Sequence, residues 1–117
     1  MTGFSSSSRN VLNRYTAERF TGDTLFHRIA RAVCAAECLP RKELYEAWET
    51  AKRVRRRMRG GPVVELAAGH GLLGAILLIL DDTSPTATCV DINRPPSQAR
   101  VLAELINVWP RLAGRVH

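Results

Sequence analysis

The sequence contains few cysteines and no long apolar run. Three cysteines are an odd number and too few for a disulfide framework, which favours a reducing cytoplasm. Cys34 and Cys38 lie one helical turn apart but have no further ligands nearby in sequence, so no metal site is predicted. The longest apolar run covers residues 72–80, less than half of the roughly 20 residues that a membrane helix needs. Because the first residues also lack an apolar signal core, we expect a cytoplasmic protein with no membrane partner.

The positive charge of the chain is concentrated in its first half. The 117 residues carry a net charge of +6. Residues 1–62 hold 13 basic and 6 acidic side chains, whereas residues 63–117 hold 4 and 5. Hydrophobic residues make up 45% and charged residues 24% of the chain, which is typical of one globular domain.

The first half divides into a segment without periodicity and a helical extension. Residues 1–22 include four consecutive serines and few regularly spaced apolar residues, so we expect a flexible segment. Residues 23–61 carry two helical patterns. The first begins at Asp23 or Thr24, and the second, which is basic, follows Pro40 and ends at the two glycines before Pro62.

Residues 62–117 alternate between strand and helix patterns. A strand at 63–66 leads through a glycine-rich turn into an apolar helix at 72–80. A second strand at 86–90 leads to a helix that we expect Ser97 to cap, and residues 115–117 are typical of a third strand beginning. The β-α-β-α order predicts an α/β fold, the start of a doubly wound, Rossmann-like parallel sheet.

The turn after the first predicted strand carries the clearest functional signal. Residues 65–71 form the segment ELAAGHG, and the second strand ends at Asp91. Glycines let a turn pass close to a ligand, and the helix that follows offers free N–H groups. An acidic residue that closes the next strand can accept hydrogen bonds from ribose hydroxyls. Gly69 and Asp91 are 22 positions apart, close to the spacing of about 20 that this geometry requires.

These residues resemble the cofactor-binding motifs of the class I, Rossmann-like S-adenosylmethionine-dependent methyltransferases. The resemblance covers residues 60–117 and implies that Glu65 orients the methionine end of S-adenosylmethionine and that Asp91 holds its ribose. The other cofactor-binding residues that it implies are Ala67, Gly69, His70, Gly71 and Ile92. Ala67 stands where the family's motif has its first glycine.

Two other functions remain open. Gly69, Gly71 and Gly74 also satisfy the GxGxxG spacing of dinucleotide sites, so an NAD-binding oxidoreductase fragment is one alternative. A non-catalytic binding module is the other. Glu65 favours the methyltransferase because a carboxylate attracts the ammonium and sulfonium of S-adenosylmethionine and repels an anionic pyrophosphate.

The second predicted helix ends in a run of cations. One interpretation is a solvated face whose charges interact favourably with the helix dipole, and the other is a patch that binds RNA or another polyanion. RNA is therefore the first candidate for the methyl acceptor. It must be a long substrate, because the run lies at the opposite end of the sheet from the turn. The cations are Lys52, Arg53, Arg55, Arg56, Arg57 and Arg59.

The resemblance also implies a truncated chain. In the family, a fourth strand pairs with the first, and the substrate and catalytic motif follows that fourth strand. We therefore expect the cofactor-binding half of a methyltransferase, with no catalytic residue assigned. An unpaired edge on the strand at 63–66, beside an apolar helix, predicts self-association of the isolated chain.

Overall fold

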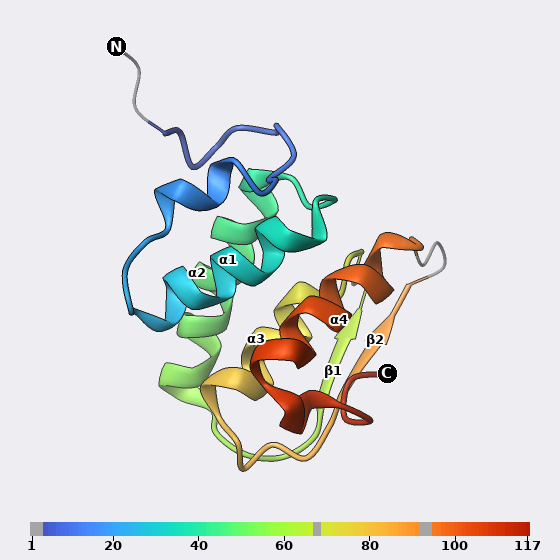
Figure 1. The fold of residues 1–117 in the computed structure, drawn as a ribbon. Helices are drawn as coiled ribbons and strands as arrows, with labels where there is room; N and C mark the ends of the chain where they lie inside the picture. The colour runs from blue at the N-terminus through green and yellow to red at the C-terminus, as the bar shows by residue number, and fades with distance from the viewer. Residues whose placement is uncertain (1–3, 67–68, 92–94) are drawn as a thin grey trace.

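The computed structural model describes residues 4–66, 69–91 and 95–117. This part of the chain forms an α/β fold with four α-helices and a two-stranded parallel sheet (Figure 1). In chain order the elements are the 3-10 helix η1 (Thr16–Arg19), α1 (Leu25–Ala36), α2 (Arg41–Arg57), β1 (Val63–Leu66), α3 (Leu72–Leu80), β2 (Ala87–Val90), α4 (Ser97–Val108) and the 3-10 helix η2 (Pro110–Leu112).

α1 and α2 form where the sequence predicts two helices. The Thr24 hydroxyl accepts a hydrogen bond from the backbone N–H of His27 at 3.2 Å, so Thr24 caps α1. The helix ends at Glu37, whose φ of 54° is left-handed. Pro40 precedes α2 as its N-cap, a position where its missing N–H costs no intrahelical hydrogen bond.

The two strands pair in parallel and end at the same edge of the sheet. Val63 lies opposite Ala87, and Leu66 lies opposite Val90. α3 connects the strands and packs against both. On the other side of β2, a single parallel bridge joins Ala87 to Val116, and the backbone N–H of Ala87 donates to the Arg115 carbonyl at 2.8 Å. The predicted third strand is therefore represented by one bridge, and the spatial order is Val116, β2, β1.

The expected helix cap at Ser97 is wrong. Ser97 is the first residue of α4, and the N-cap is Pro96, which makes no side-chain capping bond. The φ and ψ of Pro96, −57° and −27°, are already helical. The chain therefore enters the helical conformation one residue earlier than the serine predicts, because the proline ring presets φ.

The N-terminal segment packs against the helical pair from residue 4 onward. Leu12 and Phe20 are buried, and the backbone N–H of Leu12 donates to the Leu39 carbonyl at 2.8 Å. The periodicity of the sequence does not reveal these contacts, because apart from the short helix η1 this segment is irregular.

One hydrophobic core joins the helical extension to the strand-containing half. α2 packs against α3, and α1 packs against α4, so residues 23–61 and 62–117 bury their apolar side chains together. The radius of gyration, 13.5 Å, is close to the roughly 13 Å expected for a compact chain of this length. Within the described ranges, no helix has the length and apolar character needed to cross a membrane.

Candidate functional site

The carboxyl end of the sheet carries the glycine turn. Gly69 and Gly71 have φ values of 53° and 72°, in the left-handed region that favours glycine. Gly71 is the N-cap of α3, so the turn leads directly into the amino end of that helix. Two predicted site residues, Ala67 in the turn and Ile92 after β2, lie outside the described residues.

Glu65 extends from β1 toward α3. Its Oε1 accepts hydrogen bonds from the backbone N–H of Gly74 at 3.0 Å and from the Cys89 thiol at 3.7 Å. Burial raises the pKa of Glu65, and these two donors offset part of that increase. A Cβ on Gly74 would lie only 3.2 Å from the sulfur of Cys89 in β2 and 3.3 Å from Oε1 of Glu65 in β1. Gly74 therefore allows α3 to approach both strands closely.

Asp91 directly follows β2 and holds the turn itself. Its Oδ2 accepts a hydrogen bond from the backbone N–H of Gly69 at 2.8 Å. Both carboxylates that the sequence places at successive strand ends thus accept a backbone N–H at the carboxyl end of the sheet. Asp91 bonds the turn, and Glu65 bonds the first helical turn that follows it. Negative charge at this position also interacts favourably with the amino end of α3.

His70 makes a contact that the sequence does not reveal. Its Nδ1 lies 2.7 Å from Oε2 of Glu43, in the first turn of α2. The two residues are 27 positions apart, and they meet because α2 packs beside α3. This pair connects the helical extension to the glycine turn.

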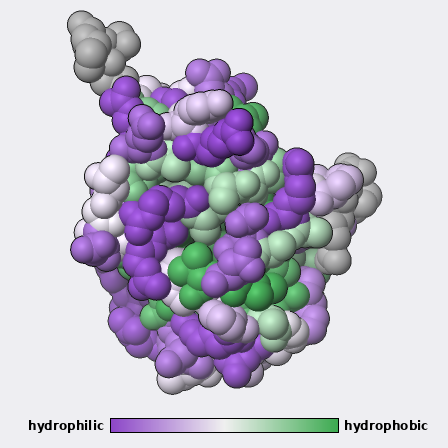
Figure 2. Space-filling model, viewed as in Figure 1, coloured by the Kyte–Doolittle hydropathy of each residue, from purple (hydrophilic) through white to green (hydrophobic). Residues whose placement is uncertain are grey.

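Two hollows adjoin the turn. The larger, of about 340 Å³, lies between the turn, α4 and the last residues of the chain, and His70 and His117 contribute to its mainly apolar lining. The smaller, of about 210 Å³, lies between the turn and α2, and its lining includes Glu43, Glu46 and Glu65. Figure 2 shows hydrophobic surface over the part of the fold where α3 and α4 lie, with hydrophilic residues around it. The turn therefore has an apolar hollow on one side and an acidic hollow on the other.

Most of the predicted cations of α2 are exposed at the opposite end of the sheet. Lys52 forms an ion pair with Glu49 at 3.1 Å. Because α2 leads into β1, the run lies at the amino end of that strand, whereas the turn lies at its carboxyl end. The exposed cations are Arg53, Arg56, Arg57 and Arg59.

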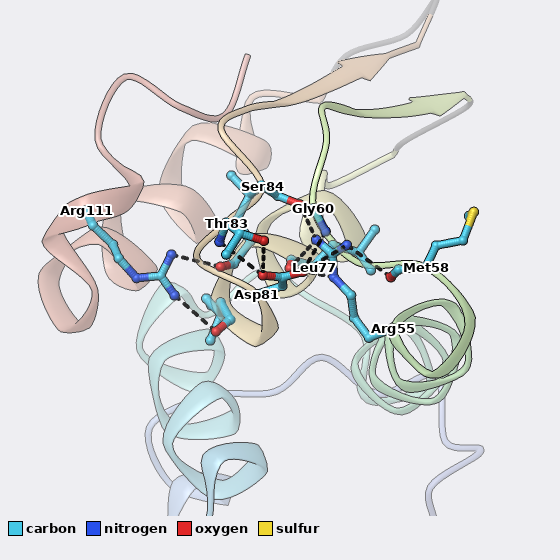
Figure 3. A network of polar contacts seen from close by, with 10 residues as sticks. Arg55, Met58, Gly60, Leu77, Asp81, Thr83, Ser84 and Arg111 are labelled. Carbon is cyan, nitrogen blue, oxygen red and sulfur yellow. Dashed lines mark hydrogen bonds and ion pairs between the residues drawn. The ribbon is translucent and has the colours of Figure 1, made fainter.

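Arg55, which the sequence groups with these cations, is buried instead (Figure 3). Its guanidinium donates twice to the Leu77 carbonyl, at 2.7 and 3.1 Å, and once to the Ser84 hydroxyl at 2.7 Å. The Asp81 carboxylate lies 3.8 Å away. A phosphate cannot reach a side chain that is only 5% exposed, so Arg55 does not belong to the candidate nucleic-acid interface.

Arg111 holds the same end of α3 from the other side. It donates to the carbonyls of Leu78 and Ile79 at 2.8 and 3.0 Å. The last carbonyls of a helix lack intrahelical partners, and Arg111 supplies donors to two of them, whereas the Leu77 carbonyl that Arg55 contacts also accepts the backbone N–H of Asp81. Next to this network, hydrogen bonds to the carboxylate of Asp81 lower its pKa to about 2. The bond from the Thr83 hydroxyl has the largest effect.

Comparisons of the chain with protein-family models, with curated proteins and with solved structures find no match. The inference about function therefore depends on the site itself. The fold and the site define an α/β protein with a candidate ligand-binding turn at the carboxyl ends of two neighbouring parallel strands, where Asp91 bonds the turn and Glu65 bonds the start of α3.

Proposed function

We propose that this chain binds S-adenosylmethionine at the glycine turn and is the cofactor-binding part of a Rossmann-like, class I methyltransferase. One observation carries the proposal: Glu65 and Asp91 come from the carboxyl-terminal parts of adjacent parallel strands, and Asp91 bonds the turn before α3 while Glu65 bonds the first turn of α3 itself. Ligands of doubly wound folds bind outside the carboxyl ends of the strands. The parallel arrangement of Val116, β2 and β1 is consistent with such a sheet.

The space beside Gly69 is open to a ligand. Apart from the flanking residues, no atom of the described chain lies within 4 Å of the position that a Cβ on Gly69 would occupy. S-adenosylmethionine supplies a methyl group bound to a positively charged sulfonium and also carries an ammonium. The half-buried carboxylate of Glu65 favours such a cation, and Asp91 is the acceptor for the ribose hydroxyls.

NAD is the second candidate ligand and would make the chain part of an oxidoreductase. The close packing of Gly74 against both strands matches the role of the third glycine in dinucleotide-binding folds. Glu65 opposes this candidate, because its carboxylate would repel the pyrophosphate. A non-catalytic binding module would share the affinity of the turn for its ligand without transferring a methyl group.

Calorimetric titration of the full chain separates the two ligands. We expect S-adenosylhomocysteine and S-adenosylmethionine to bind more tightly than NAD. Asp91→Ala should weaken S-adenosylhomocysteine binding by about 1–3 kcal/mol, roughly 5- to 150-fold. The control Asp82→Asn removes an exposed carboxylate after α3 and should leave the affinity unchanged. Tighter binding of NAD, or binding of neither ligand, would contradict the proposal.

A second substitution tests the charge argument separately. Glu65→Gln keeps an oxygen that can accept the N–H of Gly74 but removes the negative charge. We expect weaker binding of S-adenosylmethionine and unchanged or tighter binding of NAD. Equal effects on both ligands would show that Glu65 acts through the conformation of the turn alone.

We also propose RNA as the methyl acceptor, held by the exposed arginines at the end of α2 and directly after it. Arg53, Arg56, Arg57 and Arg59 form no ion pair within the described part of the chain, so their charge is available to phosphates. They lie at the amino end of β1 and the turn lies at its carboxyl end. Only a substrate that extends along the sheet reaches both.

The salt dependence of RNA binding tests this interface. Each single-strand phosphate neutralised contributes about −0.7 to the slope of log affinity against log salt. Replacing Arg53, Arg56 and Arg57 with Gln should reduce the slope by up to roughly 2. A matched control removes the same charge elsewhere, at the exposed residues Arg9, Arg14 and Arg115. An unchanged slope, or an equal reduction in both variants, would leave α2 with a solvated basic face and no specific contact.

A further inference from the structure

β1 has one edge that no strand covers within residues 4–66, 69–91 and 95–117. The backbone N–H of Val63 donates to the Thr86 carbonyl at 2.9 Å, so the polar groups of Val63 face β2. Successive residues of a strand direct their backbone groups to opposite sides. The N–H and C=O groups of Val64 and Leu66 therefore point toward the open edge.

An apolar groove of about 460 Å³ follows this edge. Val54 and Met58 line it from the end of α2, and Leu73 and Leu77 line it from α3. Met58 is 64% exposed and directly follows α2, which ends at Arg57. An open strand edge beside exposed apolar side chains is a template for pairing with another strand.

The charges at the two ends of the strand differ in sign. Arg57 and Arg59 are exposed at the amino end of β1, whereas the carboxylates of Glu65 and Asp91 lie at the carboxyl end of the sheet. If a second copy pairs with β1 in antiparallel orientation, the basic end of each copy lies beside the acidic end of the other. A parallel arrangement would place like charges together.

We propose that two copies of this chain associate through β1, with the two β1 strands antiparallel, so that their sheets join into one of four strands. A twofold axis relates the copies, and each presents the same edge to the other, so the assembly closes at two. The opposite edge of the sheet carries the bridge between β2 and Val116, which disfavours extension into a filament. This inference is independent of the ligand proposed above.

Sedimentation of the full chain with a proline variant tests the proposal. The native chain should sediment as a dimer of twice 13.0 kDa. Val64→Pro removes an N–H that faces the open edge and leaves the pairing with β2 in place, so it should give a monomer with a preserved cooperative melt. A native chain that is monomeric at every concentration tested, or a Val64→Pro variant that melts cooperatively and remains dimeric, would overturn the proposal.

Two lysine variants keep the test decisive if the proline variant does not fold. Leu66 and Val90 are opposite each other in register, on the same face of the sheet, and are 75% and 47% exposed. Only Leu66 belongs to the strand at the open edge. Leu66→Lys should abolish the dimer, and the matched control Val90→Lys should preserve it. Dissociation in both variants would indicate face-to-face packing of the two sheets and contradict pairing through the edge.

Amide hydrogen exchange provides a measurement on the native chain itself. Dilution below the dissociation constant should accelerate the exchange of the Val64 and Leu66 amides, because their N–H groups face the open edge. The Val63 amide bonds the Thr86 carbonyl and should exchange at a rate that does not depend on concentration. Concentration-independent exchange at all three positions would count against the interface.

Discussion

Removal of the Arg55 guanidinium is the substitution whose effect on the free energy of unfolding follows most directly from the structure. The guanidinium occupies a site that is 5% exposed and donates three hydrogen bonds to the Leu77 carbonyl and the Ser84 hydroxyl. Arg55→Met keeps much of the side-chain length and removes all of these donors. The substitution leaves the fully buried hydroxyl of Ser84 without the Arg55 donor. It also removes the positive charge that lies 3.8 Å from the Asp81 carboxylate.

Removing one partner of a buried charged network lowers the free energy of unfolding by about 3–5 kcal/mol. The total free energy of unfolding of a domain of this size is about 5–15 kcal/mol, so the variant should unfold at a clearly lower urea concentration. Arg55→Lys keeps the charge but not the planar, forked geometry of the guanidinium, and we expect a smaller decrease of about 1–3 kcal/mol. Urea denaturation followed by circular dichroism measures both.

The neighbouring Arg56 provides the matched control, because it is exposed on the same helix. Arg56→Met should change the free energy of unfolding by no more than about 0.5 kcal/mol. If Arg55→Met and Arg56→Met have equal effects, the buried network does not stabilise the carboxyl end of α3, and the argument from the structure is refuted.

Three further predictions concern the pH dependence, a close contact and a helix cap. Since the pKa of Asp81 is lowered from 3.8 to about 2, its contribution to stability is complete above pH 3.8 and is lost as the pH falls through 2. The free energy of unfolding, measured between about pH 4 and about pH 2, should therefore fall less in Asp81→Asn than in the native chain. Gly74→Ala would ordinarily stabilise a helix by about 1 kcal/mol; here we expect destabilisation by about 1–3 kcal/mol, measured by urea denaturation, because the added Cβ would lie 3.2–3.3 Å from both strands and force these neighbours to move. Thr24→Ala should lower the free energy of unfolding by about 1 kcal/mol by removing the cap of α1, whereas Thr21→Ala, at an exposed position before the helix, should have little effect in the same assay.

Local structure could be predicted from the sequence because its signals are short-range. Apolar spacing and a capping threonine locate α1, and β-branched residues followed by glycines locate β1 and the turn. The placement of Glu65 and Asp91 at the same end of the sheet follows from the parallel pairing of the two strands. The sequence placed the N-cap of α4 wrongly at Ser97. Serine is a common capping residue, but its presence after two prolines does not reveal that Pro96 already has helical φ and ψ angles.

Contacts between distant residues could not be predicted, since they depend on how helices pack. The pair of Glu43 and His70 exists only because α2 lies beside α3. For Arg55 a signal was present: Leu44, Ala51 and Arg55 are spaced by seven and four residues, so all three lie on one face of α2, and all three are buried. The five neighbouring cations concealed this spacing, because a run of like charges suggests a uniformly solvated surface.

The two arginines at the carboxyl end of α3 come from opposite sides of that helix in the sequence. Because synthesis runs from the amino terminus, Arg55 leaves the ribosome before this helix and Arg111 leaves after it. A helix of nine residues is too short to be stable alone. The nascent chain therefore holds an apolar segment that is anchored from one side only until Arg111 emerges. Shortening the chain before Arg111 would thus remove support from a helix that lies some thirty residues upstream, and the loss would extend to the first half of the molecule.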